Sequence, residues 1–252
     1  MISAIIITYN EEKNIRDCLE SIKWADEIIL VDSHSIDRTV DIAKEYTDKI
    51  LNRTWEGFAA QKDFAYRQAK GDWVLSIDAD ERVTPELKNE ILKVISEDKE
   101  AEGFKIPRRN FFLGKWIRTC HWYPDYQLRL FRNGKARMHF VKVHEGFLVE
   151  GMTKELKHDL IHLTFENLAD IYRKINYYST LAAEEKWERK KVGAFSIFLH
   201  ATAAFFTDFI SRKGFKDGIH GFLVSTINMS TNLLTYIKIW EKQRNKRTGI
   251  NL

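Results

Sequence analysis

The chain has 252 residues, of which 44% are hydrophobic and 30% are charged, a balance typical of a globular protein rather than a disordered one. This length suits one large α/β domain, alone or with a helical appendage. The formal net charge of +4 is mild and no nucleic-acid-binding motif is recognisable, so we expect no nucleic-acid partner. Two cysteines make no disulfide framework and the first residues show no signal-peptide pattern, which together favour the cytoplasm.

The first hundred residues alternate between strand and helix patterns. Apolar runs predict strands, and amphipathic segments of ten or more residues separate them, which indicates βαβ units and a mostly parallel sheet flanked by helices. We expect strands at 2–8, 27–31, 49–51 and 72–77, and helices at 11–23, 37–46, 57–69 and 85–95. Polar clusters follow three of these strands, at 8–11, 32–35 and 78–81. Because ligands bind at the carboxyl ends of parallel strands, the three clusters are expected to face one crevice.

The rest of the chain has a different character. Residues 103–165 are rich in aromatics and arginine, with short strand patterns at 103–107, 126–131, 136–139 and 141–149 that predict a smaller mixed or antiparallel region. An amphipathic helix is expected over 167–192, followed by apolar stretches at 193–211 and 219–237, each about one bilayer thickness long. We therefore predict a catalytic domain at 1–165 and a helical, membrane-associated region at 166–252.

The strongest single motif is WVLSIDADE at 73–81, in which an apolar strand delivers Asp78 and Asp80 at its end. Mg²⁺ and Mn²⁺ are hard cations that prefer carboxylate, phosphate and water oxygens. A metal held there can bridge a diphosphate and offset the charge that develops on a leaving group. The plainer interpretation is a loop with solvated acids or a helix N-cap.

Three further features stand near the other predicted strands. Thr8-Tyr9-Asn10-Glu11 follows the first strand, and Asp32 follows the second, where it is placed to accept hydrogen bonds from a base or ribose. Lys62 lies in the helix-forming segment 57–69 and is a candidate for a phosphate contact. Alone, Asp32 is better interpreted as a turn residue, and the alternative for Lys62 is an exposed helix lysine.

Together these motifs resemble those of the family 2 glycosyltransferases, which have the GT-A fold. The resemblance runs through TYNEEKNI, EIILVDSHSIDRT, GFAAQKDFA and AKGDWVLSIDADE, in order and at the family's spacing. It implies a nucleotide-sugar donor held by Thr8, Tyr9, Glu11, Asp32, Lys62 and the Asp78-Ala79-Asp80 motif, with a divalent metal, Mg²⁺ or Mn²⁺, at the two aspartates. The family usually reads Ala-Arg-Asn where this chain has Gln61-Lys62-Asp63, and the lysine keeps the charge without the forked geometry.

The later segments resemble the branch that includes lipopolysaccharide core β-glucosyltransferases of the WaaE/KdtX type. The segments WYPDYQLRLFRNGKARMHFVKVHEGF, HLTFENLADIYRKINYYSTLAAEE and RKGFKDGIHGF carry this resemblance over nearly the whole chain. An inverting transfer needs a base that takes the proton of the acceptor hydroxyl, and a carboxylate is the usual choice in this fold. Glu145 is the first candidate and Asp125 the second, although either can be a structural acid.

Some GT-A enzymes use a histidine after the core domain, which suggests His162 as a further metal ligand, and a structural histidine is the alternative. Gln127, Arg129 and Arg132 can face acceptor or phosphate oxygens, or the arginines can simply pair with acids.

Basic clusters border the two apolar stretches of the last third, at 186–191, 212–216 and 242–247. Apolar faces with basic borders suit the anionic cytoplasmic leaflet of the inner membrane. We expect peripheral attachment rather than spanning helices, because an uncompensated Asp208 in hydrocarbon is costly. An ordinary helical hairpin packed on the domain is the alternative.

The motifs and the resemblance together predict an inverting, metal-dependent glycosyltransferase that moves a sugar onto a lipopolysaccharide core or other glycolipid acceptor. The resemblance favours glucose from UDP-glucose, and ADP-heptose and other donors stay open. The alternatives are a polyprenyl-phosphate sugar transferase, whose phosphate acceptor needs no strong base, and a non-catalytic nucleotide-binding module.

Overall fold

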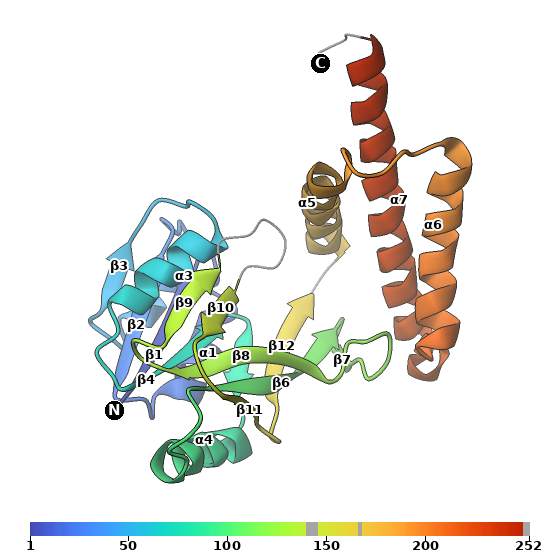
Figure 1. Ribbon diagram of the computed structural model, residues 1–252. Helices are drawn as coiled ribbons and strands as arrows, with labels where there is room; N and C mark the ends of the chain where they lie inside the picture. Colours follow the sequence, from blue (N-terminus) through green and yellow to red (C-terminus); the bar gives the residue numbers. More distant parts are fainter. Residues whose placement is uncertain (140–145, 166–167, 249–252) are drawn as a thin grey trace. The chain divides into compact units, whose positions relative to one another are not determined.

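The computed structural model describes residues 1–139, 146–165 and 168–248 (Figure 1). Its contacts divide the chain into two units. The first unit comprises Met1–Asn110 and Pro124–Leu163, and the second comprises Phe111–Tyr123 and Thr164–Leu252.

Residues 111–123 pack with the C-terminal helices in the second unit. Phe112, Ile117 and Cys120 of this segment are buried against Ile171 and Val224 of those helices. Burial of these apolar side chains stabilises the second unit.

The main sheet follows the order β3-β2-β1-β4-β8-β6-β12-β5, with β11 and β7 pairing with β6. Strands β1 to β4 are parallel, and β8 runs antiparallel to β4 and β6. The strands are β1 (Ile2–Thr8), β2 (Glu27–Asp32), β3 (Ile50–Asn52), β4 (Trp73–Asp78), β5 (Glu81–Val83), β6 (Gly103–Phe112), β7 (Lys115–Trp116), β8 (Asp125–Arg132), β11 (Thr153–Glu155) and β12 (Leu160–Phe165). A separate antiparallel pair is formed by β9 (Ala136–His139) and β10 (Gly146–Val149). This confirms the mostly parallel α/β sheet expected from the sequence.

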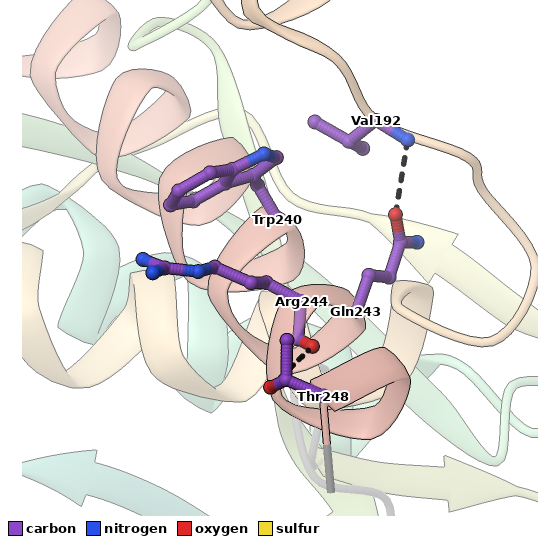
Figure 2. Close-up of a pocket in the computed structure, with 5 residues that line it drawn as sticks. All are labelled: Val192, Trp240, Gln243, Arg244 and Thr248. Carbon is purple, nitrogen blue, oxygen red and sulfur yellow. Dashed lines mark hydrogen bonds between the residues drawn. The ribbon is translucent and has the colours of Figure 1, made fainter. Parts of the chain in front are cut away.

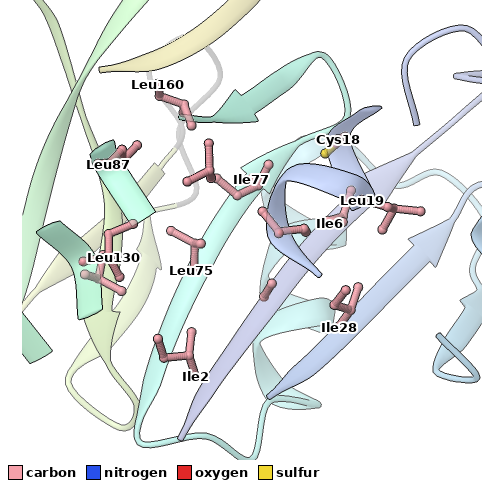
Figure 3. Packing of buried hydrophobic residues seen from close by; sticks show 14 of the residues in the cluster. Ile2, Ile6, Cys18, Leu19, Ile28, Leu75, Ile77, Leu87, Leu130 and Leu160 are labelled. Carbon is pink, nitrogen blue, oxygen red and sulfur yellow. The ribbon is translucent and has the colours of Figure 1, made fainter. Parts of the chain in front are cut away.

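The β1 segment ISAIIIT is buried on both faces, and its side chains point alternately into two hydrophobic clusters on opposite sides of the sheet. Ile6 joins a cluster in which Leu75 and Ile77 of β4 pack with Cys18 and Leu19 of α1 (Ile15–Ile22) (Figure 3). On the opposite face, Ile5 packs in a second cluster that contains Ala59 and Ala65 of α3 (Phe58–Arg67), together with Phe131 and Phe147. A strand with two buried faces reads as a continuous β-branched run, which explains the sequence pattern.

The helices of the first unit are α1 (Ile15–Ile22), α2 (Thr39–Ala43), α3 (Phe58–Arg67) and α4 (Pro85–Glu97). Thr84 caps α4, since its hydroxyl accepts from the Leu87 N–H at 3.2 Å and Pro85 follows it. The first helix begins at Ile15 and not at Glu11. Asn10 has a φ of 55° and accepts from the Ile36 N–H at 2.9 Å, so it links the loops after β1 and β2.

In the second unit, the long helix α7 (Ile219–Thr248) packs against both α5 (Leu168–Lys186) and α6 (Ala194–Phe206) (Figure 1). A π-helical turn (Thr207–Ser211) and a 3₁₀ turn (Gly214–Asp217) connect α6 to α7. Among the described residues, the 18-residue stretch Ala194–Ser211, with a mean hydropathy of 1.3, is long and apolar enough to cross a membrane, which by itself is weak evidence.

Asp208 is not the uncompensated acid that the sequence suggested. Its carboxylate is buried in the second unit, where it accepts from Arg212 at 2.8 Å and from Asn228 at 2.5 Å. The premise of an unpaired Asp208 is therefore wrong, because a partner one turn away and another on α7 satisfy it.

Candidate active site

The carboxyl ends of β1, β2 and β4 lie side by side, since Thr8 is in register with Asp32 and Ile7 with Asp78. The Thr8 hydroxyl donates to Asp32 Oδ1 at 3.0 Å, and the Ser35 N–H donates to Asp32 Oδ2 at 2.7 Å. Asp32 is almost fully buried, so these contacts fix its orientation at the strand end. The three clusters that the sequence placed at one edge of the sheet are therefore brought together.

The loops after β1 and β2 are bound to each other. The Asn10 N–H donates to Ser35 Oγ at 2.8 Å, and the Glu11 N–H donates to Thr39 Oγ1 at 2.7 Å. Tyr9 directly precedes these two residues in the chain, and 57% of its surface is exposed. An exposed tyrosine on a fixed loop offers a flat face for stacking against a planar base.

Helix α3 is anchored to this edge through Gln61, which is fully buried. Its Nε2 donates to Ser33 Oγ at 2.9 Å and to the backbone carbonyls of Arg53 and Thr54, each at 3.1 Å. Gln61 thus fixes the position of α3 relative to the end of β2, and with it the position of the next residue, Lys62.

Asp78 is paired with two cations. Lys62 Nζ lies 2.6 Å from Asp78 Oδ1, and Arg129 Nη2 lies 2.5 Å from Asp78 Oδ2. Burial opposes ionisation of this carboxyl, but Arg129 and Lys62 outweigh that effect and hold the pKa of Asp78 well below its usual range. Arg129 therefore pairs with acids, one of the two roles considered for it, and Lys62 reaches the end of β4 rather than open solvent.

Glu81 is a second carboxylate that pairs with Arg129, and it also pairs with Arg108. It is fully buried, its Oε1 accepts from Arg129 at 2.5 Å and from Arg108 at 3.1 Å, and its Oε2 accepts from the Asp78 N–H at 3.0 Å. Between Asp78 and Glu81, the Ala79 side chain is buried in the core and its carbonyl accepts from Arg82 at 2.9 Å.

Asp80 and His162 form a second pair. The Asp80 Oδ2 lies 3.4 Å from His162 Nε2, and the other ring nitrogen, Nδ1, is hydrogen-bonded to Asn110 Oδ1 at 2.6 Å. The two segments are held in this register by the antiparallel pairing of β12 with β5, in which His162 is opposite Glu81.

Because Asn110 offers its carbonyl oxygen, the Nδ1 of a neutral His162 carries the proton, and the Nε2 lone pair is directed to the side of Asp80. One carboxylate and one imidazole nitrogen suit a divalent metal whose other ligands are phosphate oxygens and water. Within residues 1–139, 146–165 and 168–248 no group of three or more His, Cys, Asp or Glu side chains could hold a metal ion. Asp80 and His162 are accordingly two candidate metal ligands, fewer than would hold a metal ion by themselves.

Asp125 is held by four donated hydrogen bonds. Arg108 donates to Oδ2 from Nε at 3.0 Å and from Nη2 at 2.6 Å, Asn110 donates to the same oxygen at 3.1 Å, and Gln127 donates to Oδ1 at 2.7 Å. Burial raises the pKa of this carboxyl less than Arg108 and the amides lower it, so the net pKa of Asp125 is below its usual range. A carboxylate stabilised in this way is a weak base.

The remaining predictions fall elsewhere. Arg132 stacks over Trp73 at 4.6 Å and pairs with Glu102 at 3.2 Å, so it faces the opposite end of β8. Glu145 lies outside the described residues.

Arg108, Asn110 and the structural role of Glu81 were not predicted from the sequence. The strand pattern at 103–107 continues to Phe112 in the structure, and this extension places Arg108 and Asn110 on the same side of β6. Residues 108–112 read Arg-Arg-Asn-Phe-Phe and show no alternation of apolar and polar side chains, so no strand signal is present there in the sequence.

A small pocket of about 170 Å³ lies in the second unit and is lined by Val192, Trp240, Gln243, Arg244 and Thr248 (Figure 2). None of its lining residues is an acid, and no predicted donor-site residue belongs to it.

Comparisons with known proteins agree with this geometry. Residues 3–153 match the model of the glycosyl transferase family 2. The chain is 31% identical over 249 residues to the lipopolysaccharide core biosynthesis glycosyltransferase LpsC of Rhizobium meliloti strain 1021, covering 96% of this chain and 92% of LpsC. It is 28% identical over 271 residues to an uncharacterized glycosyltransferase of Rickettsia conorii, with 99% and 93% of the two chains covered.

Among solved structures, the chain is similar to residues 1–349 of S. aureus TarS in complex with UDP-GlcNAc, with a TM-score of 0.51, 15% identity, and 98% and 92% of the chains covered. This likeness concerns the fold, and it agrees with the GT-A architecture expected from the motifs. The match to the family model and to LpsC extends the same assignment to most of the sequence. The chain therefore belongs to glycosyltransferase family 2 and is a glycosyltransferase of that family.

Proposed function

We propose that the protein is an inverting, metal-dependent glycosyltransferase that moves glucose from UDP-glucose onto a lipopolysaccharide core or other glycolipid acceptor. The main support for this proposal is the arrangement of side chains at the end of β4. Lys62 and Arg129 form ion pairs with Asp78, and His162 lies next to Asp80. Cationic side chains suit a diphosphate, and the acid–histidine pair suits its metal. The acceptor class rests on the similarity to LpsC along the whole chain, and UDP and glucose rest on the resemblance of the motifs.

In this proposal Thr8, Tyr9, Glu11 and Asp32 hold the nucleoside. The exposed Tyr9 ring stacks on the base, and the fixed Asp32 carboxylate accepts from the base or ribose. Lys62 would then contact the diphosphate, with Asp78 orienting its ammonium group.

Asp80 and His162 are the residues that would hold Mg²⁺ or Mn²⁺. When bound, such a metal offsets negative charge on the departing diphosphate. Asp78 joins the metal only by giving up an ion pair with Lys62 or Arg129, so we assign it chiefly to orienting those cations. Asn110 supports the site by fixing the His162 tautomer.

Glu145 remains our proposed base for the acceptor hydroxyl. Asp125, the other candidate, has its oxygens engaged by Arg108, Asn110 and Gln127, which favours a structural role for it. In an inverting displacement the base removes the hydroxyl proton as the acceptor oxygen attacks the anomeric carbon from the face opposite the nucleotide.

We further propose that the protein works on the cytoplasmic face of the inner membrane, attached peripherally. The support is an apolar α6 flanked by basic residues at 186–191 and 212–216, a composition that suits an anionic leaflet.

The test is nucleotide release from a panel of nucleotide sugars with lipopolysaccharide acceptors, in the presence of Mn²⁺ or of a chelator. We expect release with UDP-glucose that needs both the acceptor and the metal. An Asp80→Ala variant should also lose the rise in melting temperature that UDP-glucose and Mn²⁺ cause in the wild-type protein.

A Glu145→Gln variant separates the acceptor classes. A hydroxyl acceptor predicts a severe loss of rate, whereas a polyprenyl phosphate, which is already an anion, predicts little loss. Absence of nucleotide release with every donor, metal and acceptor would refute the enzymatic proposal for this chain.

A further inference from the structure

Helix α6 and the turns that follow it carry a continuous row of exposed apolar side chains. On α6 and the π-helical turn, each is between 50% and 78% exposed, and the 3₁₀ turn and the start of α7 extend the row. We call this set the α6 row: Phe195, Phe198, Leu199, Phe206, Ile210, Phe215, Ile219 and Phe222.

The row has one face. At about 100° per residue, Phe195, Phe198, Leu199 and Phe206 fall within an arc of roughly 100° on α6, and the buried Ala201 lies outside that arc. Lys191 stands before the row, and Lys213 and Lys216 flank Phe215, all of them in exposed or partly exposed positions. An apolar stripe bordered by cations matches the boundary between the acyl chains and headgroups of an anionic bilayer.

The start of α6 is fastened to α7 within the second unit. Gln243 of α7 accepts from the Val192 N–H at 3.2 Å and donates to the Trp187 carbonyl at 3.0 Å, a contact that Figure 2 shows for Val192. The segment that leads into α6 is therefore held against the C-terminal half of α7.

The other end of α6 is fastened as well. Buried Asp208 binds Arg212 and also Asn228 of α7. Asp217 in the turn beyond accepts from the backbone N–H groups of Arg118 and Thr119, at 3.0 and 3.1 Å. The turn is thus attached to residues 111–123 as well as to α7, and α6 cannot swing away from the unit at either end.

A spanning α6 conflicts with these attachments. Helix α5 runs along α7 and is fixed to it by Lys238, whose Nζ donates to Asn176, Ser179 and Thr180 at 2.7 to 2.9 Å. A bilayer crossed by α6 and α7 would also have to take in α5, whose Arg173 and Lys186 are exposed. Charges in the hydrocarbon region are costly, so the attached bundle favours an α6 that lies on the membrane.

We propose that α6 lies in the plane of an anionic bilayer with the α6 row inserted at the acyl–headgroup boundary, while α5 and α7 beyond Phe222 stay on the aqueous side. This inference rests on the proposed attachment to the membrane and specifies its surface and orientation. The occupant is a lipid bilayer containing anionic phospholipid.

The first experiment uses the full chain and vesicles of phosphatidylcholine with phosphatidylglycerol. A Phe195→Ser/Phe198→Ser variant should bind at least about tenfold more weakly than the wild type, because two inserted phenyl rings are lost. The matched control is Tyr172→Ser on α5, an equally exposed aromatic outside the row, which should bind as the wild type does. Binding should also weaken in vesicles of phosphatidylcholine alone.

The second experiment measures depth with nitroxide labels on Phe195→Cys, Phe206→Cys and Ile210→Cys. Cys18 and Cys120 are buried, which also raises the pKa of both thiols, so the introduced cysteines label selectively. An in-plane α6 predicts one shared shallow depth for the three labels. A spanning α6 separates the first and last labels by about 22 Å along the helix and would overturn the proposal.

Two more results would refute it. One is wild-type vesicle affinity in the Phe195→Ser/Phe198→Ser variant. The other is a concentration-dependent dimer that this variant loses while neither protein binds vesicles, which would assign the row to a second copy of the chain. UDP binding measured on the same samples distinguishes failure of the proposed function from failure of this inference. Absence of UDP binding counts against the donor site and not against the α6 row.

Discussion

Replacing Glu81 by glutamine tests the electrostatic foundation of the donor site. Glu81 is fully buried, with one oxygen accepting from Arg129 and Arg108 and the other from the Asp78 N–H. A glutamine has the same shape, but its amide carries one acceptor oxygen and one NH₂ donor where glutamate has two acceptor oxygens. In either amide orientation that NH₂ group faces an existing donor, which leaves buried cationic or backbone N–H groups without an acceptor.

Breaking a buried ion pair on one side costs about 3–5 kcal/mol, and since glutamine keeps one acceptor we expect about 3 kcal/mol for Glu81→Gln. For a chain of this size that corresponds to a fall in Tm of roughly 6–12 °C. Calorimetry at neutral pH measures it. The matched control is Glu45→Gln, which removes the same charge from a bidentate arginine pair at an exposed position and should change Tm little. Equal shifts in the two variants would refute the buried-network reasoning.

Three further outcomes are expected from the same site. The pKa of Asp125 is lowered because Arg108 and the amides outweigh the opposing effect of burial, so the charge of Asp125 stabilises the fold fully above about pH 4 and progressively less as the pH falls. The Tm should therefore decline less steeply with falling pH in an Asp125→Asn variant than in the wild type. An unchanged slope would contradict the assignment. His162→Ala should weaken Mn²⁺ binding in the presence of UDP by at least tenfold in titration calorimetry, and undiminished affinity would remove this histidine from the metal site. Lys62→Met should weaken UDP binding on the order of tenfold while leaving uridine binding nearly unchanged, and an equal loss for both ligands would argue against a diphosphate contact.

The donor side was largely predictable because its signals are local. A strand such as ISAIIIT or WVLSID carries its own pattern, and the parallel arrangement follows from the helices between strands. Once the strands are parallel and adjacent, the polar residues at their ends must share an edge, so Thr8, Asp32 and Asp78 could be placed together from the sequence.

The partners of these residues could not be found in the same way. Asn110 and His162 meet across 52 positions of sequence, and Arg129 reaches Asp78 across 51, through antiparallel pairings that no local pattern specifies. Asp125 was the second candidate base because a carboxylate is the usual choice in this fold. The donors that occupy it, Arg108 and Asn110, lie on the extended part of β6. The ion pair between Lys62 and Asp78 was likewise not predicted, because Asp78 lies 16 residues further along the chain, on another element.

The interruption of the first unit by residues 111–123 bears on how the protein is made. These residues carry Phe112, Ile117 and Cys120, and their partner Val224 is synthesised about a hundred residues later, which at 5–20 residues per second is a delay of roughly 5–20 s on the ribosome. During that interval the apolar segment emerges without its partners. The same dependence means that a shortened chain ending near residue 165 leaves these side chains uncovered, so expression of the catalytic half alone calls for removal or redesign of 111–123.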